Sequence, residues 1–413
     1  MADNIKTSST IPNTSFTVHN SKITAVWTQD EEAPKTSHCE TSGNVVDLGH
    51  RFVCPGLTDC HVHLTATPGD VTLKGMYAAE TSTLAFRSAY LCSEMLLRGF
   101  TTVRDTGGAD AGLRDCIEEG LVKGPRVFIA GKALSQTGGH GDFRVRHVST
   151  QHQCCGDIPG LSRICDGVPQ CLEAVRDEIR CGADFIKIMC GGGVATLTDP
   201  LSMIQFTPEE IRAITTTAAY SGKYVTAHAY TNEAIRHAVD NGVRGIEHGN
   251  FVNAETAQYL KEKEVVRTPT LVVYQAYEVV DKKPPFDDLI PESSKAKNSE
   301  VLASGLQPLK ILEDAGVTMC YSSDLLSDSA TTNAAKYLGM EGKLGCITPG
   351  AFVDFIVLDQ DPLEDVTVLD RVESLLSVVK DGRVVASKIE SLVQDESYHA
   401  FNLKSSHSLT EPL

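Results

Sequence analysis

The sequence has no apolar stretch that approaches the ~18 residues needed to cross a membrane. Its opening segment, MADNIKTSSTIPNTS, is polar and lacks the apolar core of a signal peptide. Both absences argue against a membrane-spanning or secreted protein. We therefore expect a cytoplasmic protein with no membrane partner.

Positive charge is also scarce, because 37 Lys and Arg residues face 54 Asp and Glu residues and the net charge is -17. Such a chain is not attracted electrostatically to nucleic acid or to anionic membrane surfaces, which argues against both as partners. The 13 cysteines have neither a regular framework nor CxxC spacing. We interpret them as reduced thiols, as is usual in the cytosol.

The chain of 413 residues is longer than one ordinary domain, and it suits a large barrel with a small additional module. We expect a disordered leader over 1–14 and a polar tail over 391–413. Short β-prone runs over 15–54 and 341–390 are interpreted as the two parts of one small β-sandwich module. The remainder, 55–340, is predicted to form the main domain.

A repeated pattern organises this main domain. Five times a helical stretch ends in glycine, a short apolar run follows, and the run ends in a residue that can bind metal or a proton. The runs begin after Gly99, Gly182, Gly222, Gly242 and Gly316, and they end at Asp105, Lys187, His228, His248 and Asp324. Glycine after a helix supplies a left-handed cap, and an apolar run suits a strand buried on both faces.

Three further runs complete a set of eight strands. They are the strand near residue 52, PRVFIAG after Gly124, and EVVRTPTL near residue 268. Eight strands alternating with helices over about 270 residues are typical of an α/β fold of the (β/α)8 TIM-like barrel type. In such barrels the active site lies at the carboxyl ends of the strands.

The segment FVCPGLTDCHVHL, residues 52–64, places His61 and His63 two positions apart. Residues i and i+2 of a strand point to the same side, so both imidazoles can reach one point. Taken alone, such a pair also fits two ordinary polar side chains. The histidines and aspartate at the other strand ends favour a metal site, because imidazole and carboxylate suit Zn²⁺ and similar ions.

Lys187 is unusual among these residues, because an ammonium group is repelled by a metal ion. It fits the site if burial lowers its pKa and the neutral amine reacts with CO2 to form a carbamate that bridges two metals. The alternative is a barrel lysine paired with a carboxylate, such as Asp184 or Glu247.

The order HxH, Lys, His, His, Asp on successive strands resembles the amidohydrolase superfamily of metal-dependent hydrolases. ALSQTGGHGDF, GADFIKIMCGGGV and FTPEEIRAI resemble the branch that contains Xaa-Pro dipeptidases, N-acyl amino acid carboxypeptidases and ochratoxinase-like amidases. The resemblance extends over about residues 15 to 390. It implies an enzyme that hydrolyses the amide or peptide bond of a small N-acyl amino acid or dipeptide.

The resemblance also implies roles for the strand-end residues. One zinc ion would be bound by His61, His63 and Asp324, a second by His228 and His248, and carboxylated Lys187 would bridge the two. Asp324 would accept a proton from the metal-bridging hydroxide as it attacks the amide carbonyl. Barrels of this family often pair, which makes a homo-oligomer possible.

Two further residues are candidates for contact with the substrate. His140 follows the third strand in a glycine-rich turn, and the resemblance implies that it hydrogen-bonds the scissile carbonyl or the substrate carboxylate; otherwise it is an ordinary loop histidine. Tyr230 lies two residues past His228, where it could donate a hydrogen bond to the developing oxyanion.

The eighth βα unit departs from the family pattern. Only six residues separate Asp324 from TTNAAKYLGM, whereas a βα unit averages about 30 residues. This shortening predicts a looser metal site and makes an impaired, scaffold-like amidohydrolase fold one alternative. A second alternative is a cyclic-amide hydrolase similar to imidazolonepropionase.

Overall fold

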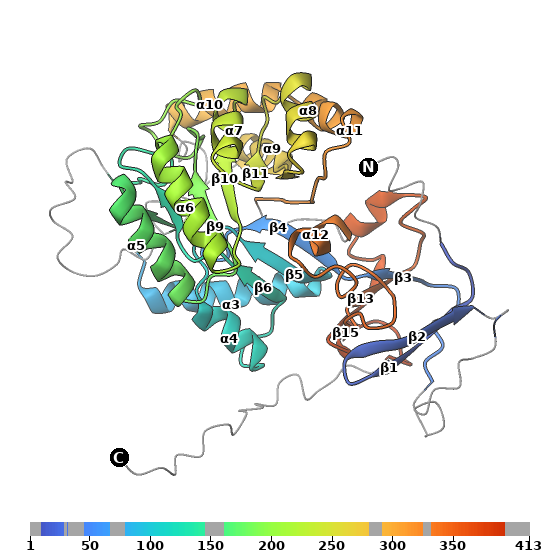
Figure 1. Ribbon diagram of the computed structural model, residues 1–413. Helices are drawn as coiled ribbons and strands as arrows, with labels where there is room; N and C mark the ends of the chain where they lie inside the picture. Colours follow the sequence, from blue (N-terminus) through green and yellow to red (C-terminus); the bar gives the residue numbers. More distant parts are fainter. Residues whose placement is uncertain are drawn as a thin grey trace, which may run out of the picture.

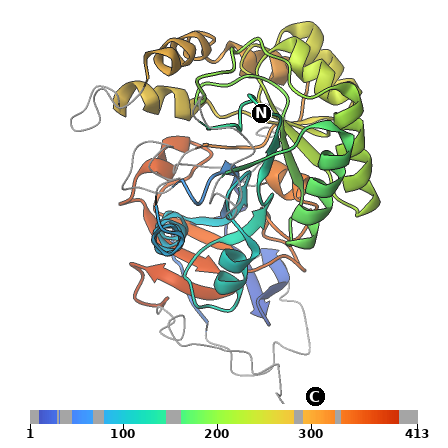
Figure 2. The same cartoon turned by 90° about the vertical axis from the view of Figure 1, so that its left-hand side faces the viewer.

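The computed structural model describes residues 10–28, 31, 45–66, 79–144, 161–280, 291–324 and 332–392. Most of the expected leader and tail, and residues 325–331 of the shortened eighth unit, lie outside these ranges. A larger α/β region stands beside a smaller β region, as Figures 1 and 2 show. The smaller region brings together the blue amino-terminal and red carboxy-terminal segments.

The larger region is built on parallel strands. They are β4 Leu57–Val62, β5 Phe100–Asp105, β6 Arg126–Ile129, β7 Ala133–Ser135, β8 Ser162–Ile164, β9 Ile186–Met189, β10 Val225–Ala229, β11 Gly245–His248 and β12 Val266–Thr268. One sheet has the order β4-β5-β6 and the other has the order β12-β11-β10-β9-β7-β8. Every strand pairing within these two sheets is parallel.

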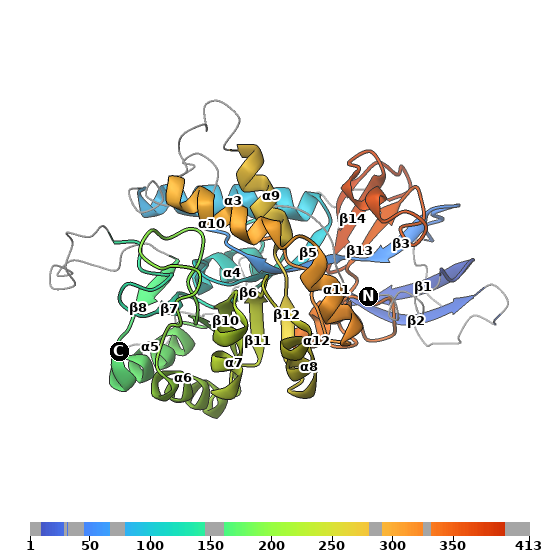
Figure 3. The same ribbon diagram turned by 90° about the horizontal axis from the view of Figure 1, so that it is seen from above.

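Helices alternate with these strands. They are α3 Thr81–Leu97, α4 Ala111–Glu118, α5 Gly167–Arg180, α6 Pro208–Tyr220, α7 Asn232–Asp240, α8 Ala254–Glu262, α9 Leu271–Val280, α10 Glu292–Ala303, α11 Gln307–Asp314 and α12 Thr332–Tyr337. Figure 3 shows α5, α6, α7 and α8 in a row along one side of the strands. In α6, Ile211, Ile214 and Ala218 are fully buried at helical spacing, so one face of the helix packs on the sheet.

The turns of this region follow the local sequence. The five glycines predicted to end helices, Gly99, Gly182, Gly222, Gly242 and Gly316, all have φ between +69° and +97°. Helix α6 begins with a capping box, in which Thr207 and Glu210 satisfy each other's backbone N–H groups and Pro208 is the first helical residue. The prediction for the five glycines is confirmed.

The predicted closed barrel is found only in part. Its seam depends on residues 317–324, which form one parallel bridge between Met319 and Arg267. They also form two hydrogen bonds with β4, from Cys60 N to Tyr321 O at 3.0 Å and from Asp324 N to His61 O at 2.8 Å. At the opposite seam, Asp184 N donates to Ile129 O at 2.7 Å. Isolated backbone hydrogen bonds thus replace a continuous strand ladder at both seams within the described residues. The parallel α/β arrangement is confirmed, but one continuous eight-stranded sheet is not.

The first strand of the barrel differs from the prediction. The run from residue 52 divides at Gly56 into β3 (Phe52–Pro55) and β4, and only β4 lies in the parallel sheet. A Cβ at Gly56 would lie 2.2 Å from Oγ1 of Thr101, so the chain passes too close to β5 for any larger residue. Strand β3 pairs instead with the small β region.

The small region consists of a hairpin and a four-stranded antiparallel sheet. The hairpin is β1 Thr14–His19 with β2 Lys22–Thr28, and the sheet has the order β15-β14-β13-β3, where β13 is Phe355–Leu358, β14 Leu375–Lys380 and β15 Arg383–Ser387. A short 3₁₀ helix, η2 Val366–Asp370, lies between β13 and β14. Ile23 of the hairpin shares a buried core with Val353, Phe355 and Val379, so both chain ends form one module.

Within the described residues, no helix is both long and apolar enough to cross a membrane. The ten described cysteines form no disulfide. The expectation of free thiols therefore holds for that part of the chain.

Candidate active site

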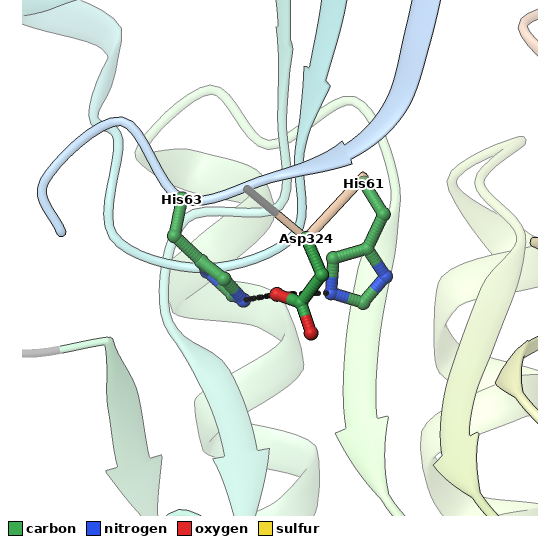
Figure 4. A group of neighbouring side chains, drawn as sticks. All are labelled: His61, His63 and Asp324. Atoms are coloured by element: carbon green, nitrogen blue, oxygen red, sulfur yellow. Dashed lines mark ion pairs between the residues drawn. The ribbon is translucent and has the colours of Figure 1, made fainter. Parts of the chain in front are cut away.

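The site lies where β4 ends beside residues 317–324, the segment that follows α11. Nε2 of His61 and Nε2 of His63 each lie 3.5 Å from Oδ1 of Asp324, as Figure 4 shows. His61 lies in β4 and His63 directly follows its last residue, Val62, and the alternation of side chains places both imidazoles on one side, as predicted from their spacing. The backbone N–H of Asp324 donates to the carbonyl of His61 at 2.8 Å, which holds the carboxylate beside the two rings.

The other predicted histidines continue from this group as a row of imidazole rings. The centroids of His61 and His248 lie 5.0 Å apart, those of His248 and His228 4.6 Å, and those of His228 and His140 4.1 Å. Nδ1 of His248 also lies 4.0 Å from Oδ2 of Asp324. The structure therefore brings all five predicted imidazoles and the aspartate into one cluster.

Backbone conformation explains how two consecutive residues of β11 both face this cluster. Glu247 accepts a hydrogen bond from His61, and the ring of the next residue, His248, also lies beside His61. In a regular strand, consecutive side chains point to opposite faces. His248 has φ +68° and Asp324 has φ +54°, a left-handed conformation that is uncommon outside glycine. Strained backbone at both residues is typical of functional sites.

Glu247 holds His61 of this cluster through a hydrogen bond, a role that the sequence did not reveal. Its Oε2 accepts a hydrogen bond from Nδ1 of His61 at 2.8 Å, and its Oε1 accepts one from Nη2 of Arg104 at 2.7 Å. Both Glu247 and Arg104 are completely buried. Because His61 uses its Nδ1–H on Glu247, its Nε2 presents a lone pair toward Asp324. His63 is oriented in the same way, since its Nδ1 donates to the carbonyl of Gly107 at 2.8 Å.

Lys187 lies on β9 in the same interior and is 1% exposed. Burial lowers its pKa to about 8, assisted by the charge of Arg104 and opposed by that of Glu247. Within the described residues, neither Glu247 nor Asp184 forms an ion pair with Lys187. Glu247 pairs with Arg104 instead, and Asp184 pairs with Arg114. A fraction of the Lys187 side chain is therefore a neutral amine near neutral pH.

Burial also lowers the pKa of the histidines. The pKa of His61 falls to about 4, mainly through burial and then through the charge of Lys187. The pKa of His63 is lowered, and those of His228 and His248 lie well below the ordinary value for the same first reason. All four are neutral near pH 7, which is the form of imidazole that binds metal.

Tyr230 is completely enclosed beside the histidines. Its ring centroid lies 4.9 Å from that of His228, and it accepts a hydrogen bond at 2.9 Å from the hydroxyl of Tyr274 on α9. The hydroxyl hydrogen of Tyr230 is thus left for another acceptor. Tyr274 was not found from the sequence, because the apolar run that carries it, LVVYQAYEVV, contains no sign of a site.

The carboxylate of Asp59 joins β4, which carries His61, to the segment that carries Asp324. Its Oδ1 accepts from the backbone N–H groups of His61 (2.9 Å) and Ser323 (3.2 Å), and its Oδ2 accepts from the Ser323 hydroxyl at 2.5 Å. The position of Asp324 therefore depends on β4.

The geometry around Asp324 fits a cation. Two imidazole lone pairs and a carboxylate oxygen, all hydrogen-bond acceptors, converge with 3.5 Å between each nitrogen and the oxygen. The three ligand atoms lie within 4.8 Å of one another. When the carboxyl group of Asp324 is ionised, no hydrogen lies between these atoms, so the arrangement is repulsive unless a positive charge lies among the acceptors. Neutral imidazole and carboxylate are also the ligands that divalent metals such as zinc prefer.

Comparison with known proteins decides the family. The sequence matches the amidohydrolase family over residues 52–328 and 325–385. This chain belongs to the amidohydrolase family. The two matched segments meet at residues 325–328, where the spacing predicts the shortened eighth unit.

Three relatives show which amidohydrolases it resembles. Ochratoxinase from Aspergillus niger is 30% identical over 366 residues, covering 80% of this chain and 75% of the relative. The crystal structure of an amidohydrolase is 37% identical with a TM-score of 0.84, covering 92% of this chain and 96% of that one. A prolidase in complex with N-methylphosphonate-L-proline is 39% identical with a TM-score of 0.81, covering 90% and 94%.

These relatives establish the general activity of the chain. Amidohydrolases of this branch hydrolyse C–N bonds. The ochratoxinase found by sequence and the prolidase found by structure are both enzymes of that kind. The chain is therefore a hydrolase that acts on C–N bonds, as the sequence predicts, and the inert scaffold loses its support. The family is metal-dependent, and the His61, His63 and Asp324 group offers a metal site.

Proposed function

We propose that this amidohydrolase cleaves the amide or peptide bond of a small N-acyl amino acid or dipeptide. The observation that carries the proposal is the convergence of the acceptor atoms of His61, His63 and Asp324. Support for the substrate class comes from the ochratoxinase and prolidase relatives. We also propose that the strands form a (β/α)8 barrel with a shortened eighth unit and a small β-sandwich module.

The proposed metals are two zinc ions. His61, His63 and Asp324 would hold one, His228 and His248 the other, and carboxylated Lys187 would lie between them. Bound at this site, the metals would lower the pKa of a water molecule and polarise the substrate carbonyl. The lowered pKa values of the four histidines support this assignment, because neutral rings need lose no proton before binding.

Asp324 is proposed to carry the proton in this reaction. Burial raises the pKa of its carboxyl group, while the charges of His61 and Lys187 oppose that rise. A carboxylate with a raised pKa can take a proton from the attacking water and later deliver it to the leaving amine nitrogen. Its place between His61 and His63 puts it beside the point where that water would be activated.

Tyr230 and His140 are proposed to hold the substrate. Tyr230 accepts from Tyr274, so its own hydroxyl hydrogen can be donated to the oxyanion that develops on the carbonyl oxygen. His140 stacks on His228 with ring planes 23° apart, which places it at the edge of the same cluster. There it can hydrogen-bond the scissile carbonyl or the free carboxylate of the substrate.

The proposal is tested by purifying the chain, measuring its metal content and screening substrates. We expect about two zinc equivalents per chain and hydrolysis of N-acyl amino acids or Xaa-Pro dipeptides, with cyclic amides inert. The variants Asp324→Asn and Lys187→Ala should abolish hydrolysis while remaining folded. Hydrolysis of a cyclic amide alone would favour an imidazolonepropionase-like enzyme. Absence of both metal and hydrolysis would instead support an impaired fold.

A further inference from the structure

A buried carboxylate lies beside His140, at the Nδ1 edge of its ring. Asp199 is completely buried, and its Oδ2 lies 3.1 Å from Nδ1 of His140. The same oxygen accepts a hydrogen bond from the backbone N–H of Gly193 at 2.8 Å, and the hydroxyl of Thr196 donates to Oδ1. This carboxylate is not explained by metal binding, because no predicted ligand contacts it.

The contacts of Asp199 determine which nitrogen of His140 carries hydrogen. Burial raises the pKa of Asp199, but the hydrogen bonds from His140 and Thr196 and the charge of Lys297 outweigh this, so its pKa lies below the ordinary value. Nδ1 of His140 lies 3.1 Å from Oδ2 of Asp199 and 2.8 Å from Oγ1 of Thr196, whose own hydrogen goes to Oδ1 of Asp199. An ionised carboxylate only accepts hydrogen bonds and the Thr196 oxygen is left as an acceptor, so Nδ1 of His140 is the donor to this pair. Nε2 has no hydrogen-bond partner within the described residues, and it is the nitrogen left for a substrate.

Lys297 of α10 fixes the loop that carries Asp199. Its Nζ donates to the carbonyl oxygens of Gly193 (2.9 Å), Thr196 (2.8 Å) and Asp199 (2.5 Å). An ammonium group has three hydrogens, and three carbonyls of one short loop take them all. Nζ also lies 3.5 Å from Oδ1 of Asp199, so it balances the buried negative charge.

Close packing completes the arrangement. A Cβ on Gly193 would lie 2.0 Å from Cε1 of His140, so only glycine lets the loop pass this close to the ring. The backbone N–H of His140 donates to Oε1 of Gln205 at 2.9 Å. Gln205 lies near the far end of the loop that carries Asp199, so this loop also holds the backbone of His140. The imidazole is thus constrained by its neighbours on several sides.

We propose that Asp199 is a positioning residue, which holds His140 with hydrogen on Nδ1 and Nε2 toward the substrate, and that Lys297 holds Asp199 in place. A buried carboxylate that accepts the Nδ1–H of a working histidine is a known way to fix both tautomer and orientation. The proposal rests on the proposed function, since it requires that His140 contacts the substrate. It adds two residues, on an unassigned loop and a distant helix, to the substrate site.

The first test is a double-mutant cycle on kcat/KM for a hydrolysed N-acyl amino acid or dipeptide. We expect Asp199→Asn to lower kcat/KM by about tenfold to a hundredfold, because misplacing a working group by about 1 Å has that effect. In the His140→Ala background, the same substitution should change kcat/KM by less than about threefold. An equal loss in both backgrounds would show that Asp199 serves the fold and would overturn the proposal.

Asp142 provides a matched control, because it is a carboxylate in the loop that carries His140. It bonds Arg144 and the N–H of Gly138 but not the His140 side chain. Asp142→Asn should have the same effect with and without His140. For Lys297, the variant Lys297→Met should lower kcat/KM in the wild-type chain but not in the Asp199→Asn chain. Equal losses in the two chains would remove Lys297 from the proposal.

The second test needs no activity. In ¹⁵N-histidine-labelled protein, the signal that disappears in His140→Ala should show hydrogen on Nδ1, and Asp199→Asn should shift that hydrogen to Nε2. A wild-type His140 without hydrogen on Nδ1 would refute the proposal before any variant at Asp199 is made. If the chain hydrolysed no substrate but the spectrum were as expected, the proposed function would fail while the positioning of His140 would stand.

Discussion

Replacing Glu247 by glutamine should destabilise the protein by about 3–5 kcal/mol, because it leaves the guanidinium of Arg104 buried without an opposite charge. Arg104 and Glu247 are both 0% exposed, and Nη2 lies 2.7 Å from Oε1. Glu247 also accepts hydrogen bonds from the hydroxyls of Thr226 and Thr268. An amide cannot accept at every one of these positions, since its nitrogen is a donor.

The loss is measured as the change in the free energy of unfolding in urea, on metal-free protein so that ligand binding does not contribute. Glu209→Gln is the matched control. Its carboxylate lies 2.7 Å from Arg212, but the two side chains are 66% and 54% exposed, so about 1 kcal/mol or less should be lost. A similar small loss for Glu247→Gln would refute the reasoning from burial.

The same substitution should also weaken metal binding by about tenfold to a hundredfold, because His61 loses the acceptor that orients its ring. Metal content after dialysis against limiting zinc checks this expectation. A double variant, Arg104→Met with Glu247→Leu, removes both charges together and should cost less than the sum of the single variants. Additive losses would show that the two side chains act independently.

Three other predictions follow from the site. The fraction of neutral Lys187 rises as pH rises through its pKa of about 8, so carbamate formation should increase with pH, detected by ¹³C NMR with labelled bicarbonate and absent in Lys187→Ala. Burial raises the pKa of Asp59 to about 7, so the stabilisation this shift gives is present in acid and lost as pH rises through 7. Ser323→Ala removes a donor to the ionised form and should cost about 1–3 kcal/mol, most of it above pH 7; a loss independent of pH in urea unfolding would contradict this. Gly193→Ala should displace His140 and lower kcat/KM as much as Asp199→Asn does, while an unchanged kcat/KM would contradict the close packing.

Much of the architecture could be read from local patterns. The five glycines that end helices, the capping box at Thr207 and the hairpin turn at Asn20 and Ser21 all depend on backbone conformations set by a few neighbouring residues. The strand-end rule then placed His61, His228, His248 and Asp324 at one rim. The division of the run from residue 52 into β3 and β4 was missed, because it depends on the close approach of Gly56 to Thr101 on another strand.

The sequence by itself determined the order of the elements, the family resemblance and the residues able to bind a metal, because spacing and residue type are local properties. Only the tertiary structure decided which groups support them. Glu247 under His61, Asp59 beside Ser323 and Asp199 beside His140 are joined by contacts that span from 59 to 264 residues of chain. Burial and the direction of each lone pair arise from packing, and no linear pattern records them.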